Sequence, residues 1–135
     1  MSEPPDGFEP YTGVNAFVDH VGPFCRSGHI IGLRIDQRHL NTFGKAQGGV
    51  LMTMVDFAIG EAIRDSHDKP REEIAAATVS LTTDFLGSVG DGDWVTAHTR
   101  VERLGGTLAF VDCSLRADSK EVVRGRAVFA VLDRD

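Results

Sequence analysis

Cysteine is scarce in this chain of 135 residues: it has two, Cys25 and Cys113, which stand far apart and form no CxxC motif. A disulfide framework is therefore excluded as the source of stability. The five histidines show no metal-binding spacing such as HxxxH, and no serine lies in a GxSxG elbow. The sequence thus predicts no metal ion and no cofactor, and it argues against a serine hydrolase.

The chain also lacks an excess of positive charge and any long hydrophobic run. The formal net charge of −6 argues against nucleic acid or an anionic membrane as a general partner. No apolar run is long enough to cross a membrane, and the acidic start, MSEPPDGFEP, holds no apolar signal core. We therefore expect a cytoplasmic protein. The acidic excess lies in the earlier part of the chain, so the C-terminal part is better suited to receive a polyanionic small molecule.

What is present fits one globular domain. Apolar residues make up 41% of the chain, and 135 residues suffice for one domain with a core but hardly for two. Residues 1–12 carry three of the five prolines and are predicted to be a loosely ordered lead-in. Residues 13–135 are predicted to form the single domain.

Two helices are predicted. Asn15 is a suitable N-cap and Gly22 a suitable stop for a short helix between them. The apolar run over residues 50–63 has the length of a buried helix. Residues 64–73, RDSHDKPREE, are then expected to form a charged surface loop.

Alternation of apolar and polar residues predicts five strands, over residues 28–38, 76–86, 93–104, 107–117 and 121–132. The last four are joined mainly by short connections, which makes them antiparallel. We therefore predict an α+β fold in which an antiparallel sheet of five or so strands wraps around one long central helix. Because one sheet can hardly cover a helix that is apolar on most sides, a second subunit is expected to complete the cover.

A carboxylate, Asp56, lies in the middle of the predicted central helix. Steps of about 100° per residue place four small or polar residues on one narrow face: Gly49, Thr53, Asp56 and Gly60. A charge in apolar surroundings is costly unless something pairs with it. At the helix start, Gly48 and Gly49 offer free N–H groups and the positive dipole end, which can hold an oxyanion. The other reading is a solvent-facing Asp on an ordinary amphipathic helix.

These residues belong to a longer pattern, which reads Asn41, Gly44, Gln47-Gly48-Gly49 and Asp56, and continues through TVSLTTDFL (78–86), Gly92-Asp93 and GGTLAFVDCSL (105–115). In this pattern the chain resembles the hotdog-fold acyl-CoA thioesterases of the PaaI-like (phenylacetate-pathway or 4-hydroxybenzoyl-CoA thioesterase) type. The motif of that family is an Asn, a Gly three residues on, His-Gly-Gly, and an Asp on the central helix. The resemblance covers nearly the whole chain beyond the lead-in.

The resemblance implies hydrolysis of an acyl-CoA thioester to a free acid and CoA. By position, the Gly48 amide polarises the thioester carbonyl, Asp56 is general base or nucleophile, and Asn41 orients water or the carbonyl from the opposite subunit. Thr78 falls where the family places a hydroxyl that helps to position water. Gln47 stands where the family has His, and because Gln cannot carry a proton, the acid–base work is left to Asp56.

The resemblance also implies a tight homodimer, often a dimer of dimers and hence a homotetramer, with two sites shared between subunits. Acyl-CoA is the expected substrate, and its acyl group stays open because both subunits shape the pocket. Gly49, like Gln47 and Thr78, is predicted to bind the substrate. Arg103, Gly106 and Thr107 are candidates for holding the CoA phosphates, although a plain hairpin turn also accounts for them.

Two other functions stay open. The chain could be a non-catalytic acyl-CoA-binding hotdog module in which Gln47 marks lost chemistry, although a buried charge such as Asp56 would then destabilise the fold without purpose. A hotdog dehydratase or hydratase is the third reading. It needs a His beside the acid, where this loop offers Gln47.

Overall fold

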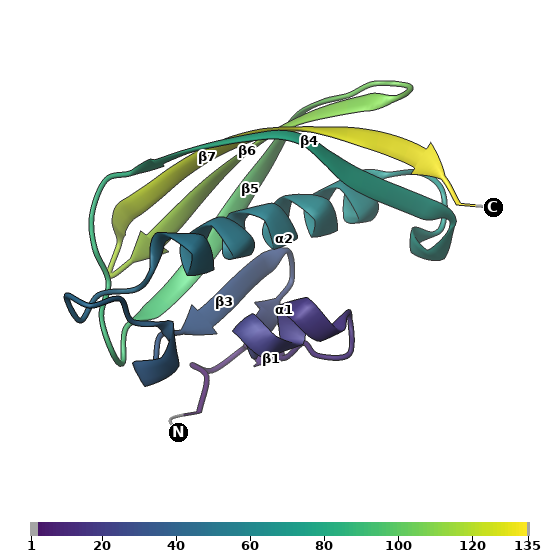
Figure 1. Cartoon of the computed structure of the whole chain (residues 1–135). Coiled ribbons are helices and arrows are strands. Elements are labelled where there is room, and N and C mark those ends of the chain that lie inside the picture. Colours follow the sequence, from purple (N-terminus) through teal and green to yellow (C-terminus); the bar gives the residue numbers. More distant parts are fainter. Residues whose placement is uncertain (1–2, 135) are drawn as a thin grey trace.

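The computed structural model describes residues 3–134. A curved antiparallel sheet is laid over one long helix, α2 (Gly48–Ser66), as Figure 1 shows. In this part of the chain the sheet has seven strands in the order β1-β2-β3-β5-β6-β7-β4. Their bounds are Glu9–Pro10 (β1), Cys25–Ser27 (β2), Ile30–Arg34 (β3), Ile74–Phe85 (β4), Trp94–Leu104 (β5), Leu108–Ala117 (β6) and Lys120–Asp133 (β7). The predicted α+β hotdog fold is confirmed, with β1 and β2 as additional short strands.

The core lies between α2 and the inner face of the sheet. Strand β6 shows the alternation that creates this face, because every second residue is buried: Ala109, Val111, Cys113 and Leu115. On α2, the buried apolar residues facing the sheet include Leu51, Met54, Val55, Ala58 and Ile59. Removing this apolar surface from water is the main force that holds helix and sheet together. None of the helices within residues 3–134 has the length and apolar character needed to span a bilayer.

The two predicted helices are both present. Helix α1 (Ala16–Val21) begins where the Asn15 side chain accepts a hydrogen bond from the Val18 amide at 2.8 Å, and the Gly22 amide closes it on the Val18 carbonyl. Helix α2 is longer than the predicted 50–63, because Gly48 and Gly49 already belong to its first turn.

Three local predictions were wrong. The strand expected over 28–38 is confined to β3, because Gly28 turns the chain at a φ of +59° and Asp36 caps a short 3-10 helix, η1 (Gln37–His39). The expected loop over 64–73 begins inside α2 and ends in a second 3-10 helix, η2 (Arg71–Glu73). Within the lead-in, Glu9–Pro10 pairs with β2, so this stretch carries more order than predicted.

Strand β4 forms one edge of the sheet and contains a bulge. Its pairing with β7 shifts between Thr78 and Ser80, which leaves Val79 as an extra residue, 60% exposed. A bulge inserts one residue into the inside–outside alternation. It therefore allows Thr78 before it and Leu81 after it both to face α2, and Thr78 does contact that helix.

Candidate active site

The loop that leads into α2 is folded around Asn41. Its side-chain Oδ1 accepts hydrogen bonds from the amides of Phe43 at 2.8 Å and Lys45 at 3.1 Å. Gly44 takes a φ of +78°, which glycine adopts without steric cost. Since both lone pairs of the Asn41 oxygen are used within the loop, its Nδ2 group is the one suited to contact a ligand.

Helix α2 starts without a side-chain cap. Gln47 precedes it in an extended conformation, donates its backbone N–H to the His39 carbonyl at 2.8 Å, and makes no capping hydrogen bond with its side chain. The first N–H groups of a helix lack partners within the helix and lie at the positive end of its dipole. Gly49 is exposed with nothing within 4 Å of where a Cβ would lie, and Gly48 is half-buried beside the Phe85 ring. The start of α2 is therefore suited to an anionic oxygen.

Asp56 and Thr78 meet between α2 and β4. The Thr78 hydroxyl donates a hydrogen bond of 2.6 Å to Oδ1 of Asp56, which is half-buried. In the described part of the chain, Thr78 is the one side chain that hydrogen-bonds to Asp56. The hydroxyl orients the carboxylate through one oxygen, so the other, Oδ2, can accept a proton or attack a carbonyl carbon.

The residues of the narrow helix face predicted around Asp56 are not equally buried. Gly49 is exposed, and Thr53 and Asp56 are half-buried, so this stripe is only partly covered in a single chain. Thr53 is tied to its own helix, because its hydroxyl donates to the Gly49 carbonyl at 2.8 Å. Gly60 belongs to the core instead, where a Cβ would lie 3.7 Å from the Phe129 ring. The stripe available to a ligand or partner therefore ends near Asp56.

The residues predicted to hold CoA phosphates do not join this site within one chain. Arg103 is exposed near the end of β5, and Gly106 and Thr107 form the β5–β6 hairpin, where the Thr107 carbonyl accepts from the Val131 amide at 2.8 Å. Figure 1 shows this hairpin at the opposite end of the sheet from the loop that enters α2. Their role in binding CoA stays a prediction.

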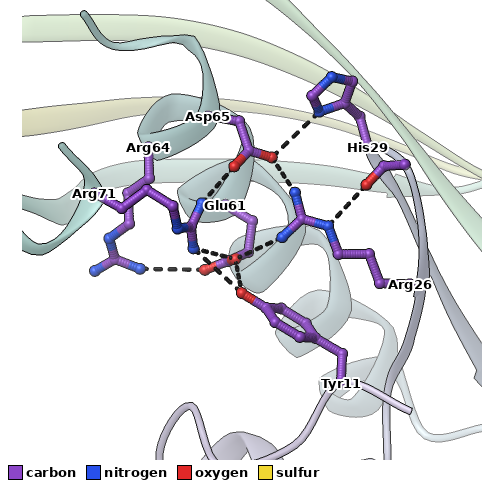
Figure 2. Close-up of polar contacts among 8 residues, drawn as sticks. Tyr11, Arg26, His29, Glu61, Arg64, Asp65 and Arg71 are labelled. Carbon is purple, nitrogen blue, oxygen red and sulfur yellow. Dashed lines mark hydrogen bonds and ion pairs between the residues drawn. The ribbon is translucent and has the colours of Figure 1, made fainter. Parts of the chain in front are cut away.

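A second carboxylate on α2, Glu61, was not identified from the sequence, and it is more deeply buried than Asp56. Glu61 is 3% exposed, and its partners are shown in Figure 2. It accepts hydrogen bonds from Tyr11, Arg64 and Arg71, and Arg26 lies 3.4 Å from it. Burial, followed by the bond to Glu61, raises the pKa of the Tyr11 hydroxyl above its ordinary value.

The cysteines do not supply a nucleophile. Burial raises the pKa of both thiols, that of Cys113 to about 12. A thiol becomes a strong nucleophile only as its thiolate, so both are poorly reactive at neutral pH. The described residues also contain no group of three or more His, Cys, Asp or Glu side chains arranged to hold a metal ion.

Comparison with known families places this geometry in context. Residues 43–124, which include the α2 start, Asp56 and Thr78, match the Thioesterase superfamily, and the chain belongs to that family. It is 37% identical over 134 residues to the putative esterase PA0474 of Pseudomonas aeruginosa, covering 96% of this chain and 98% of that protein.

Two solved structures have the same fold. The PaaI protein of the phenylacetic acid degradation operon of E. coli aligns with a TM-score of 0.73 at 20% identity, over 88% of this chain and 86% of that one. The Streptococcus mutans protein smu.793, solved bound to acetyl CoA, aligns with a TM-score of 0.69 at 23% identity, over 78% of this chain and 81% of that one. At these identities the likeness establishes the fold alone.

Proposed function

We propose that this protein hydrolyses an acyl-CoA thioester to a free acid and CoA. Membership of the Thioesterase superfamily supports thioester hydrolysis in general. The observation that carries the finer assignment is the Asp56–Thr78 hydrogen bond on the partly open side of α2, the helix whose first amides are those of Gly48 and Gly49. The acetyl CoA bound to the S. mutans neighbour supports CoA as the carrier.

The proposed reaction uses two features of this site. A water molecule attacks the thioester carbonyl while Asp56 accepts its proton, or Asp56 itself attacks and water then hydrolyses the resulting anhydride. In both routes the carbonyl oxygen becomes negative and is stabilised by the Gly48 amide. The C–S bond breaks, and CoA leaves as a thiol once it has gained a proton. Gln47 and Asn41 position the carbonyl or the water by hydrogen bonding, and Arg103 with Gly106 and Thr107 holds the CoA phosphates.

The geometry favours sites shared between two subunits. Gly48 and Asp56 lie about 12 Å apart along α2 at the usual rise per residue, too far for one carbonyl group to touch both. Two hollows within the described residues, of about 490 and 610 Å³, are lined by other residues, among them His98 in the first and Trp94 in the second. We therefore propose a homodimer, or a dimer of dimers, in which Asp56 of one chain faces Gly48 of another.

One observation favours a second function, that of a non-catalytic acyl-CoA-binding module: position 47 holds Gln, where the PaaI-like family has His. Under that reading the chain binds acyl-CoA without turning it over. For either function we propose a cytoplasmic location, because the two cysteines, Cys25 and Cys113, are free and buried.

The test is release of free CoA thiol from a panel of aryl-, short-chain and long-chain acyl-CoAs, with calorimetric binding measured on the same compounds. Turnover of at least one thioester is the expected result. Binding without turnover would establish the non-catalytic module, and neither binding nor turnover would contradict both readings.

A further inference from the structure

The Glu61 cluster is built as a closed ring of ion pairs (Figure 2). Arg71 donates to Oε1 of Glu61 at 2.6 Å through one Nη and to Asp65 through the other. Arg26 does the same from the opposite side, reaching Glu61 at 3.4 Å and also Asp65. Each arginine therefore bridges both carboxylates. Guanidinium groups suit this task because their donors form a planar fork.

The ring joins the end of α2 to η2, which follows it after residues 67–70, and to β2, which is distant in sequence. Glu61 and Asp65 lie on the last turns of α2, Arg26 comes from β2, and Arg71 begins η2. Tyr11 adds the segment after β1, and its ring lies 5.1 Å from the Arg26 guanidinium and 5.9 Å from the ring of Phe57 on α2.

The ring thereby connects the two elements that carry the Asp56–Thr78 pair. Asp56 is on α2 and Thr78 is on β4, and η2 runs directly into β4 at Ile74. Arg71 thus bonds α2 to the segment that leads into β4, beyond the proposed catalytic pair along α2. Apolar packing against the sheet already holds α2 in place, and the ring adds directed polar bonds near its C-terminal end.

The ring also holds α2 from a different side than Thr78 does. Phe57, Glu61 and Asp65 repeat every four residues and so form one stripe of the helix. Asp56 lies about 140° around the axis from Glu61 and about 7.5 Å along it. Contacts on two sides fix the rotation of a helix, and rotation of α2 would swing Asp56 away from Thr78.

We propose that Arg71, acting through Glu61 and Asp65, is a positioning residue for Asp56. This inference rests on the proposed function. Arg71 bonds to these two carboxylates and not to Asp56, so it acts on the geometry in which Thr78 presents the Asp56 carboxylate. Misplacement of a catalytic group by 1 Å can cost about a hundredfold in rate. Arg71→Met should therefore lower kcat by about ten- to hundredfold and leave KM within about twofold.

The experiment measures kcat and KM for thiol release with Arg71→Met, Arg71→Lys and, as a matched control, Arg124→Met. The Arg124 side chain is 69% exposed and, among residues 3–134, forms an ion pair with Glu121 alone, so its loss should leave both constants unchanged. Arg71→Lys keeps a charge beside Glu61 and should recover most of kcat. The Arg71 side chain is 38% exposed, so the fold should tolerate the change, which circular dichroism checks. If Arg71→Met is unfolded, Arg71→Gln carries the same test.

The double variant Asp56→Asn/Arg71→Met separates positioning from independent effects. If Arg71 acts through Asp56, the second change should cost nothing further once Asp56 is gone. Equal fold-losses in both backgrounds, or a normal kcat in folded Arg71→Met, would overturn the inference. A fully active Asp56→Asn would instead refute the proposed site, so the two failures can be told apart.

Discussion

Asp56 and Thr78 are the smallest unit on which the proposed chemistry depends. The carboxylate stands out in sequence because an apolar helix rarely carries a charge without a reason. The structure adds the partner, a hydroxyl that donates to Oδ1 at 2.6 Å. Hydrogen bonds to charged groups contribute about 1.5–3 kcal/mol, enough to hold a side chain in one orientation.

Thr78→Val tests that orientation directly. Valine keeps the shape of threonine and removes the donor, so kcat should fall by about ten- to hundredfold. Because Thr78 is exposed in the single chain, water can replace the lost donor, so the free energy of unfolding should fall by less than about 1.5 kcal/mol. Steady-state thiol release together with urea unfolding checks both values. An unchanged kcat would mean that the bond to Thr78 has no part in the reaction.

Gln47→Ala should do less harm than any change at Asp56. The Gln47 side chain is exposed and makes no cap for α2, so its removal should not weaken the helix. It can position a group but cannot transfer a proton. We expect kcat to fall by less than about tenfold, since one neutral hydrogen bond contributes about 1 kcal/mol. A loss as large as that in Asp56→Asn would show that Gln47 has a more central task.

The helices and strands that were predicted correctly are those whose formation depends on residues close together in sequence. Helix α1 was predicted because Asn15 and Gly22 are strong end signals. Strands β5 to β7 were predicted because their alternation is regular and Gly105-Gly106 marks the first hairpin turn. The long helix was predicted from its apolar run, with Gly48 and Gly49 at its start, although the predicted apolar run began only at residue 50. In each case residues close in sequence decide the structure.

The failures lie where distant segments meet. Arg71 and Asp65 were read as loop charges, yet they form a ring with Arg26 and the buried Glu61. Nothing in the spacing of RDSHDKPREE shows that β2 will lie alongside. Glu61 itself was visible within the apolar run, at a spacing of four from both Phe57 and Asp65, and that spacing was the signal to use. The Val79 bulge likewise depends on pairing with β7.

Because Tyr11 donates to the ring, we expect the free energy of unfolding to depend on pH in the alkaline range. Burial first, and then Glu61, raise the Tyr11 pKa above its ordinary 10.0. The folded protein therefore keeps a proton that the unfolded chain releases. The stabilising contribution of Tyr11 is present in full below about pH 10 and is lost as the pH rises through the folded pKa.

Tyr11→Phe should remove this dependence. At neutral pH the variant should lose about 1–3 kcal/mol of unfolding free energy, because the hydroxyl donates to an ionised, buried carboxylate. The difference between wild type and variant should shrink as the pH rises from about 9 to about 11. Urea unfolding across that range measures it. A difference that stays constant with pH would contradict the assignment.

At the scale of the whole molecule, a single chain leaves an edge and a stripe uncovered. Strand β4 ends the sheet with exposed residues at 77–80, and the α2 stripe from Gly49 to Asp56 is only partly buried. Unpaired strand edges offer a row of backbone groups to another chain. Both features fit the proposed homodimer, in which a second copy would cover them.

Light scattering at micromolar concentration should therefore give the mass of at least two chains. Val79→Lys places a charge on the β4 edge at a residue that is 60% exposed, so it should weaken assembly without unfolding the chain. Leu108→Lys, at a residue 40% exposed on β6, is the matched control and should assemble normally. A stable wild-type monomer at that concentration would contradict the shared site.

The central claim, that Asp56 performs the chemistry of thioester hydrolysis, is tested most directly by thiol release with Asp56→Asn. The amide keeps the shape of the carboxylate and removes its basicity. General base catalysis contributes typically 10²–10⁴-fold, so kcat should fall by about that factor. KM should move little, since the group acts mainly in the transition state. We expect a folded, assembled variant whose kcat is reduced by this factor and lies well below that of Gln47→Ala. Near-normal turnover by folded Asp56→Asn would show that the carboxylate is structural and that the active site lies elsewhere.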